Sequence, residues 1–239
     1  TISSDETIII TGTDGVINFA KSIKLNDTNR VNNIYQNIQF ENIYISSSNG
    51  EQSIYANGNN FIIGNSVTTS GTINIYGGSY DTSIEESNIS IYSGTWNNIY
   101  GGSNKKNVKN TNLTIISGSF NGKIVGGNNT QETTYSTNIE IKNGTFNNDI
   151  IAGNMNGQLD GTSTLTITKG VMKKSIYGGN YEGVLNGNSV VTINGGEYYG
   201  NIFAGSNLGE ITGDVTLNIE TTTAIISGGI YGGSNSGKI

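Results

Sequence analysis

Apolar and polar residues alternate in short runs along this chain, and between residues 99 and 230 the runs recur at nearly constant intervals. The clearest phrase pairs Ile with a second apolar residue, then two small residues, then Ser or Asn. It begins at Ile99, Ile124, Ile150, Ile176, Ile202 and Ile230, at intervals of 25, 26, 26, 26 and 28 residues. Such a period is typical of stacked-repeat proteins, whose units bury their apolar faces against their neighbours.

Each repeat also contains an apolar-polar-apolar segment, which predicts a strand with one buried side. These segments are Ile89-Ser90-Ile91, Leu113-Thr114-Ile115, Ile139-Glu140-Ile141, Leu165-Thr166-Ile167, Val191-Thr192-Ile193 and Val215-Thr216-Leu217. After most of them comes a glycine and, two residues later, a large side chain: Gly94 with Trp96, Gly118 with Phe120, Gly144 with Phe146, Gly170 with Met172 and Gly196 with Tyr198. We expect these glycines to adopt positive φ at a corner, with the large side chain filling the space inside it.

A third apolar position has the form Gly-x-Leu-x-Gly, as in residues 157–161 and 183–187. No segment has the spacing of an amphipathic helix. The sequence therefore predicts an all-β, single-stranded parallel β-helix with about 26 residues per rung (one turn of the solenoid) and three short strands per rung. Short crossovers between parallel strands predict a right-handed path.

We expect one domain over residues 1–239, with regular repeats in 73–239 and less regular rungs in 1–72. The predicted strands of the N-terminal part are Ile8 to Ile10, Val16-Ile17, Ile23 to Leu25, Ile34 to Phe40, Ile43 to Ile45 and Phe61 to Ile63. Residues 73–76 fit the apolar-polar-apolar segment, and Ile84 then fits the Ile that begins the repeated phrase. The return loop, which leads from that phrase to the next apolar-polar-apolar segment, is shortened in this repeat. The chain ends at Ile239, within a repeat, so we expect it to be a fragment of a longer protein.

Composition excludes several functions. With a net charge of −6 and Arg30 as the only arginine, the chain lacks the basic stripe that nucleic-acid binding requires. No apolar run is long enough to span a membrane. Cys and His are both absent, which removes disulfides, thiol nucleophiles, Cys/His zinc sites and imidazole bases.

Catalytic and metal-binding candidates are few. Polysaccharide cleavage requires paired carboxylates at set separations, and the adjacent pairs Asp5-Glu6 and Glu85-Glu86 both lie in loop-like stretches. We interpret the acidic residues as a solvated surface and predict no cofactor. Calcium is the one candidate ion, with Asp160 and Asp214 and neighbouring carbonyls as its possible ligands, although no Gly-Gly-x-Gly-x-Asp repeat is present.

The second residue of the Ile phrase carries the most suggestive pattern. If each Ile points inward, then an apolar column points outward, made of Tyr100, Val125, Ile151, Tyr177, Phe203 and Tyr231. Exposed, this column would be a binding face for a glycan or a protein. Alternatively, the return loop or the N-terminal segment covers it. The sequence leaves both arrangements open.

Two polar columns also repeat. The middle residues of the alternating segments, with Asn74 placed first, include Thr114, Thr166 and Thr192, and a flat threonine column is the feature that ice-binding solenoids use. Glu140 interrupts it, so we prefer a plain β-favouring surface. The Ser and Asn residues after the double glycine are expected to form stacked hydrogen bonds at a corner; they are Ser103, Asn128, Asn154, Asn180, Ser206 and Ser234.

The Gly-Thr-Trp and Gly-Thr-Phe segments, followed by Ile-Tyr-Gly-Gly or Ile-Ile-Ala-Gly, resemble repeats of large secreted bacterial cell-surface adhesin-like proteins. The resemblance implies a pectate-lyase-like fold without that family's catalytic Arg, His and Asp motifs. We therefore expect a non-enzymatic, secreted or cell-surface segment that acts as a stalk or presents a glycan or protein ligand-binding face. The alternatives are a carbohydrate-active β-helix, either a lyase or hydrolase or a polysaccharide-binding protein, and a trimeric fragment resembling a phage tail spike.

Overall fold

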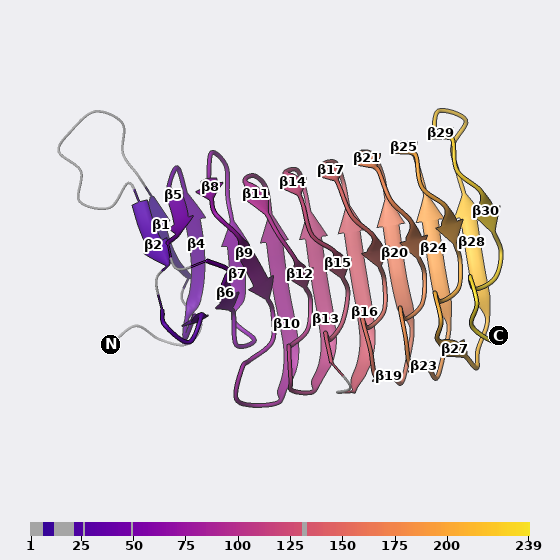
Figure 1. The fold of residues 1–239 in the computed structure, drawn as a ribbon, viewed down its shortest axis with the longest axis horizontal. Coiled ribbons are helices and arrows are strands. Elements are labelled where there is room, and N and C mark those ends of the chain that lie inside the picture. Colours follow the sequence, from indigo (N-terminus) through magenta and orange to yellow (C-terminus); the bar gives the residue numbers. More distant parts are fainter. Residues whose placement is uncertain (1–6, 12–21, 26, 49, 131–132) are drawn as a thin grey trace.

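The computed structural model describes residues 7–11, 22–25, 27–48, 50–130 and 133–239. Within these ranges the chain is all-β and forms a parallel solenoid of about eight turns, with no helix. Successive rungs lie side by side along the long axis of the molecule (Figure 1). The predicted fold class and repeat length are confirmed, whereas the right-handed path stays a prediction.

Four sheets run along the stack, and every strand pair in them is parallel. Sheet A contains β1 (Thr7–Thr11), β4 (Asn37–Glu41), β7 (Asn60–Ile63), β10 (Ile84–Ile91), β13 (Val108–Ile115), β16 (Thr134–Ile141), β19 (Gln158–Leu159), β20 (Ser163–Ile167), β23 (Val184–Leu185), β24 (Ser189–Ile193), β27 (Glu210–Ile211) and β28 (Val215–Ile219). Sheet B contains β2 (Ser22–Leu25), β5 (Tyr44–Ser47) and β8 (Thr68–Ser70).

Sheet C contains β3 (Val31–Asn33), β6 (Gln52–Tyr55), β9 (Ile73–Tyr76), β12 (Ile99–Tyr100), β15 (Ile124–Val125), β18 (Ile150–Ile151), β22 (Ile176–Tyr177), β26 (Ile202–Phe203) and β30 (Ile230–Tyr231). Sheet D contains β11 (Thr95–Trp96), β14 (Ser119–Phe120), β17 (Thr145–Phe146), β21 (Val171–Met172), β25 (Glu197–Tyr198) and β29 (Ile225–Ile226). A regular rung therefore passes through sheets A, D and C in turn.

The division of a rung into strands differs from the sequence prediction in one respect. The third apolar position does not form a sheet of its own, because Leu159 pairs with Thr134 at the start of a long strand of sheet A. In β10, β13 and β16 this position and the alternating segment lie in one continuous strand of 8 residues. The large residue after each corner glycine instead belongs to a separate short sheet, sheet D.

Two predicted positions are wrong. Residues 73–76 belong to sheet C, where Ile75 pairs with Ile99. Ile84 pairs with Val108 in sheet A and does not align with the Ile that begins the repeated phrase. Ile75 to Ser79 has the same residues as Ile99 to Ser103, which explains why this segment joins sheet C.

The last alternating segment lies two residues later than predicted, because Val191 pairs with Leu217 rather than with Val215. Val215, Leu217 and Ile219 alternate equally well, so the pattern alone could not choose between the two registers.

Residues before 73 form further rungs of the stack, as expected, but they pass through sheets A, B and C, with sheet B at the point in the rung that sheet D takes later. Phe61 pairs with Ile38 on one side and with Ile89 on the other. Of the predicted N-terminal strands, Val16-Ile17 lies outside the described residues, as does the Asp5-Glu6 pair.

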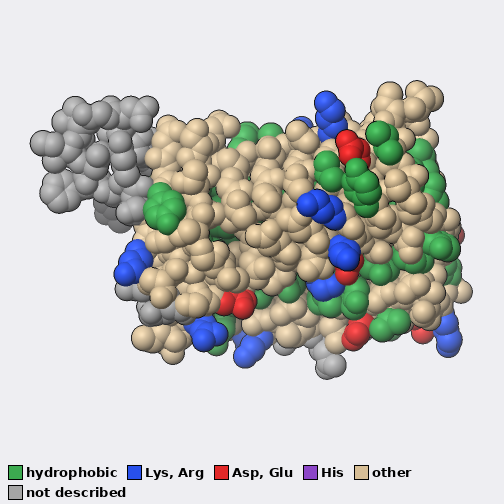
Figure 2. Space-filling view, turned by 45° about the horizontal axis from the view of Figure 1, so that its top comes forward, with side chains coloured by type: hydrophobic (Ala, Val, Ile, Leu, Met, Phe, Trp, Pro, Cys, Tyr) green, Lys and Arg blue, Asp and Glu red, His purple; other side chains and the backbone are tan. Residues whose placement is uncertain are grey.

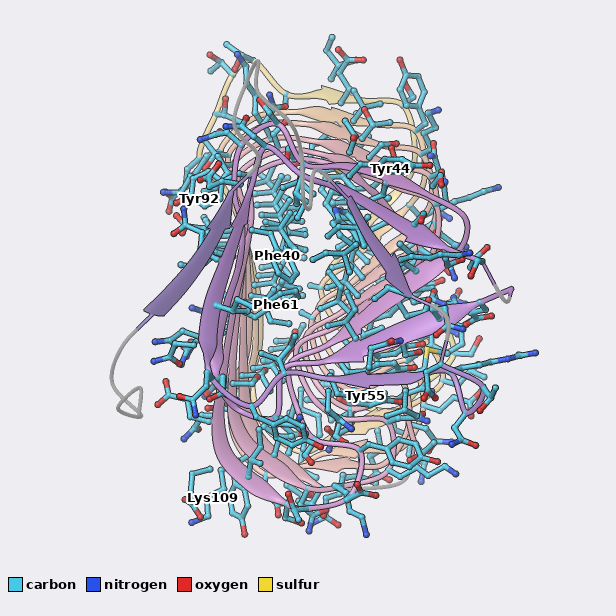
Figure 3. The ribbon with its side chains drawn as sticks, turned by 90° about the vertical axis from the view of Figure 1, so that its left-hand side faces the viewer. Phe40, Tyr44, Tyr55, Phe61, Tyr92 and Lys109 are labelled. Carbon is cyan, nitrogen blue, oxygen red and sulfur yellow. The ribbon has the colours of Figure 1, made fainter. Side chains whose placement is uncertain are left out.

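The main core fills the space between the sheets and runs the length of the stack (Figure 3). The corner glycines have positive φ, as predicted, for example 96° at Gly94 and 104° at Gly196. The polar atoms of the two largest corner side chains are satisfied locally, because Trp96 Nε1 donates to the Ser93 carbonyl at 2.9 Å and the Tyr198 hydroxyl to the Gly195 carbonyl at 2.7 Å. Buried polar groups without such partners would cost free energy.

Candidate functional site

The apolar column predicted on sheet C exists, but it is not a surface. Its side chains form a second hydrophobic cluster, which we call the outer ladder: Tyr55, Tyr76, Tyr100, Val125, Ile151, Tyr177 and Phe203. Val125 and Ile151 have no exposed area, and Tyr100 and Tyr177 retain only 6% and 7%. Tyr231 continues the column at 46% exposed. Of the two arrangements that the sequence leaves open for the candidate binding face, the covered one holds for Tyr100, Val125, Ile151, Tyr177 and Phe203, and Tyr231 is exposed.

The loops that leave sheet C cover the outer ladder. Tyr80, Met155 and Tyr181 pack against it from these loops. Tyr181 meets Tyr177 edge to face, with 5.6 Å between ring centroids, and Tyr80 meets Tyr55 in the same way at 5.4 Å. Figure 3 shows Phe40 and Phe61 in the interior between the sheets, with Tyr55 separate from them near the loops.

A partly buried ion pair holds one of these loops in place. Lys123 Nζ lies 2.9 Å from Asp149 Oδ2 and 4.4 Å from the centroid of the Tyr181 ring. Asp149 Oδ1 also accepts the backbone N–H of Ser175 at 3.1 Å. These contacts join three neighbouring rungs, so the cluster has a structural role that the sequence reading missed. The sequence does contain a signal for this covering loop, which is the apolar residue directly after the Ser or Asn of the repeat, as at Tyr181.

The Ser/Asn column has the structural role predicted for it, and we call it the amide ladder. Asn154 Oδ1 accepts the backbone N–H of Asn128 at 2.8 Å, and Asn180 Oδ1 accepts that of Asn154 at the same distance. Both side chains are fully buried. Each amide thus satisfies a backbone donor of the preceding rung, which a buried chain requires.

The acidic residues do not gather into a metal site: among the described residues no three His, Cys, Asp or Glu side chains are placed to hold an ion together. Asp160 Oδ1 accepts hydrogen bonds from the side-chain amides of Gln158 at 2.6 Å and Asn186 at 2.9 Å. Glu85 pairs with Lys109 at 2.6 Å on the exposed surface. These contacts are typical of surface carboxylates.

The threonine column on sheet A is shorter than predicted. Thr166 lies between Glu140 and Thr192, and the next member is Asn218 rather than Thr216. Asn74 is in sheet C and is buried, so it does not belong to this column. The outer face of sheet A is thus a mixed polar surface.

A groove with a volume of about 710 Å³ lies at the corner between sheets A and D. We call it the corner groove. Its walls are Thr168 to Val171, Asn194 to Glu197, and Asn143, Thr223 and Ile225. Figure 2 shows hydrophobic side chains, lysines and a carboxylate gathered in the C-terminal half of this face.

Tyr199 lies two residues beyond Glu197 and is 55% exposed. Its hydroxyl donates to Glu197 Oε2 at 3.1 Å, and this hydrogen bond together with the carboxylate charge raises the pKa of Tyr199. The hydrogen bond joins an exposed aromatic ring to Glu197, which lines the groove. The sequence reading did not single out this residue, although Tyr199 replaces the asparagine found at this position in earlier repeats.

The comparisons with known proteins supply no relative: no family model, curated protein or solved structure matches the chain. No described segment is a helix long and apolar enough to cross a membrane. The geometry is therefore the basis for a functional proposal.

Proposed function

We propose that this chain is a non-enzymatic scaffold of a secreted or cell-surface, adhesin-like protein, acting as a stalk or presenting a ligand-binding face to a glycan or protein. The observation that carries the proposal is the continuity of the stack. Sheet C alone links nine strands in parallel from β3 to β30. The core and the outer ladder follow it on its two sides.

Such a stack suits a spacer, because each rung is held by its neighbours and the length grows with the number of rungs. The amide ladder adds a buried hydrogen bond between successive rungs, as from Ser103 to Asn128 at 2.7 Å. The adhesin-like part of the proposal rests on the resemblance of the repeats.

Location on intact cells tests the proposal. An antibody raised against the folded chain should label intact cells of the source organism, and brief surface proteolysis should remove the label. A cytoplasmic marker protein serves as the control and should stay unlabelled until lysis. Labelling that appears only after lysis would contradict the proposal.

A further inference from the structure

We propose that the corner groove binds an uncharged polysaccharide. This inference deepens the ligand-presenting part of the proposed function and rests on it, by naming the face and the class of ligand; binding is measured on the purified chain, so its outcome is separate from that of the cell-surface test. Three features of the groove carry it: a local departure from the repeat, the chemistry of its walls, and its direction along the stack.

The repeat changes character where the groove lies. The outward residue that opens each strand of sheet D is Thr95, Ser119 or Thr145 in the first three strands and Val171, Glu197 or Ile225 in the last three. Two residues later, Asn97, Asn121 and Asn147 give way to Lys173, Tyr199 and Ser227.

This change removes hydrogen bonds and exposes apolar surface. In the earlier rungs Asn147 Nδ2 donates to Asn121 Oδ1 at 2.9 Å, a contact that Lys173 and Tyr199 cannot continue. In the later rungs Ile225 is 58% exposed and Tyr199 is 55% exposed. A β-stack needs neither side chain at these positions, and together they give the polar groove an apolar edge.

The walls offer the groups that a sugar chain uses. Asn143, Asn194 and Thr168 provide amide and hydroxyl groups that donate and accept hydrogen bonds. Ile225 on the wall provides apolar surface, and the Tyr199 ring, two residues beyond the wall residue Glu197, provides a flat aromatic face for the C–H groups of a sugar. One cation, Lys169, and one anion, Glu197, line the groove, so it favours neither sign of ligand charge.

The groove also runs along the stack. Its walls come from four successive rungs, at Asn143, Thr168, Asn194 and Thr223. With strands about 4.8 Å apart, these rungs span about 14 Å, which is long enough for several sugar units. A chain lying along the groove would meet equivalent backbone corners at each step, so a polymer fits this surface better than a single sugar.

Binding of immobilised neutral polysaccharides tests the proposal, with a soluble β-glucan, a mannan and chitin oligosaccharides as probes and polygalacturonate as the anionic comparison. We expect the wild type to bind at least one neutral probe with little dependence on salt. Tyr199→Ser should weaken that binding by about tenfold, because it removes the aromatic platform. Ile225→Thr should also weaken it, since it restores the residue type of the earlier rungs.

The matched control is Tyr135→Ser, which removes another exposed tyrosine, 48% accessible, from β16 on sheet A. It should bind as the wild type does. Circular dichroism and the thermal midpoint establish whether each variant is folded. If Tyr199→Ser is not folded, binding by Ile225→Thr tests the proposal. The proposal is overturned if no neutral probe binds or if the folded groove variants bind as tightly as the wild type. Tighter, salt-sensitive binding of polygalacturonate would also overturn it, by assigning an anionic ligand.

Discussion

At the scale of single residues, the two small residues after each sheet C strand from β9 onward differ in how far they vary. The first is alanine in two of these rungs, at Ala152 and Ala204, and glycine in the others. The second is glycine in all of these rungs, and a Cβ on Gly127 would collide with Oδ1 of Asn154. This close approach is what allows the buried amide of one rung to reach the backbone N–H of the rung before it.

Two threonines in one column lead to opposite expectations. Thr111 and Thr137 are paired in neighbouring rungs and both are buried. The Thr111 hydroxyl donates to the Gly126 carbonyl at 2.6 Å, whereas no partner for the Thr137 hydroxyl exists among the described residues. Thr111→Val should therefore lower the free energy of unfolding by about 1 kcal/mol, and Thr137→Val should leave it unchanged or raise it by up to about 1 kcal/mol.

Urea denaturation followed by circular dichroism measures both changes. Because the two substitutions are chemically the same and lie one rung apart, each is the control for the other. Equal losses in the two variants would contradict the hydrogen-bond assignment.

At the scale of elements, sheet C separates two apolar layers. Its inward isoleucines join the core and its outward residues join the outer ladder, where rings stack in register. Tyr76 lies 4.7 Å from Tyr55 and from Tyr100, measured between ring centroids, with nearly parallel planes. Stacks of this kind form because identical side chains repeat at the strand spacing.

Burial of these phenols predicts a loss of stability at alkaline pH. Burial raises the pKa of both Tyr55 and Tyr100 to about 12, and that of Tyr76 is also raised. In the unfolded chain tyrosine ionises near pH 10. Their contribution is fully present below about pH 10 and is lost as the pH rises through about 12, because the unfolded state releases protons that the folded state retains.

Unfolding midpoints in urea from about pH 9 to about pH 11.5 measure this effect. Tyr100→Phe should reduce the slope, because one raised phenol is gone, while Tyr135→Phe at an exposed position should leave it unchanged. A wild-type midpoint that stays constant over this range would refute the prediction.

At the scale of the whole molecule, each rung pairs through its strands with the rungs directly before and after it. A central rung is held from both sides, as Ile150 is by Ile124 and Ile176, whereas Ile230 at 48% exposure pairs with Ile202 in sheet C. The free energy of local opening in such a stack depends on neighbouring rungs rather than on one central core.

Hydrogen exchange should therefore be graded along the stack. We expect the slowest amide exchange in β13, β16 and β20 and faster exchange toward β28 and β30. Ile150→Ala should lower the free energy of unfolding by about 2–5 kcal/mol, and Ile230→Ala should lower protection mainly in its own rung. Mass spectrometry of exchanged peptides measures both effects, and uniform protection along the chain would contradict this picture.

Much of the fold could be predicted from local patterns. The Ile phrase gave the rung length, and alternation identified core residues such as Ile139 and Ile141, because successive side chains of a strand point to opposite sides. Positive φ at Gly94 followed from the glycine that recurs at the corner after the alternating segment. These features depend on neighbours in sequence or on an exact repeat.

Register and exposure were not determined in this way. Alternation fits Val215 and Leu217 equally well in either register, and only pairing with Val191 selects Leu217. Likewise, the alternation of side chains along a strand places Tyr100 and Tyr177 on the outward side of sheet C. Whether they contact water depends on loops, such as the one that carries Tyr181, that fold back over them. The corner groove arises from Asn143, Lys169, Glu197 and Thr223 meeting across four rungs. Their proximity is a product of stacking, because residues a full turn apart in sequence become neighbours only when the solenoid has formed.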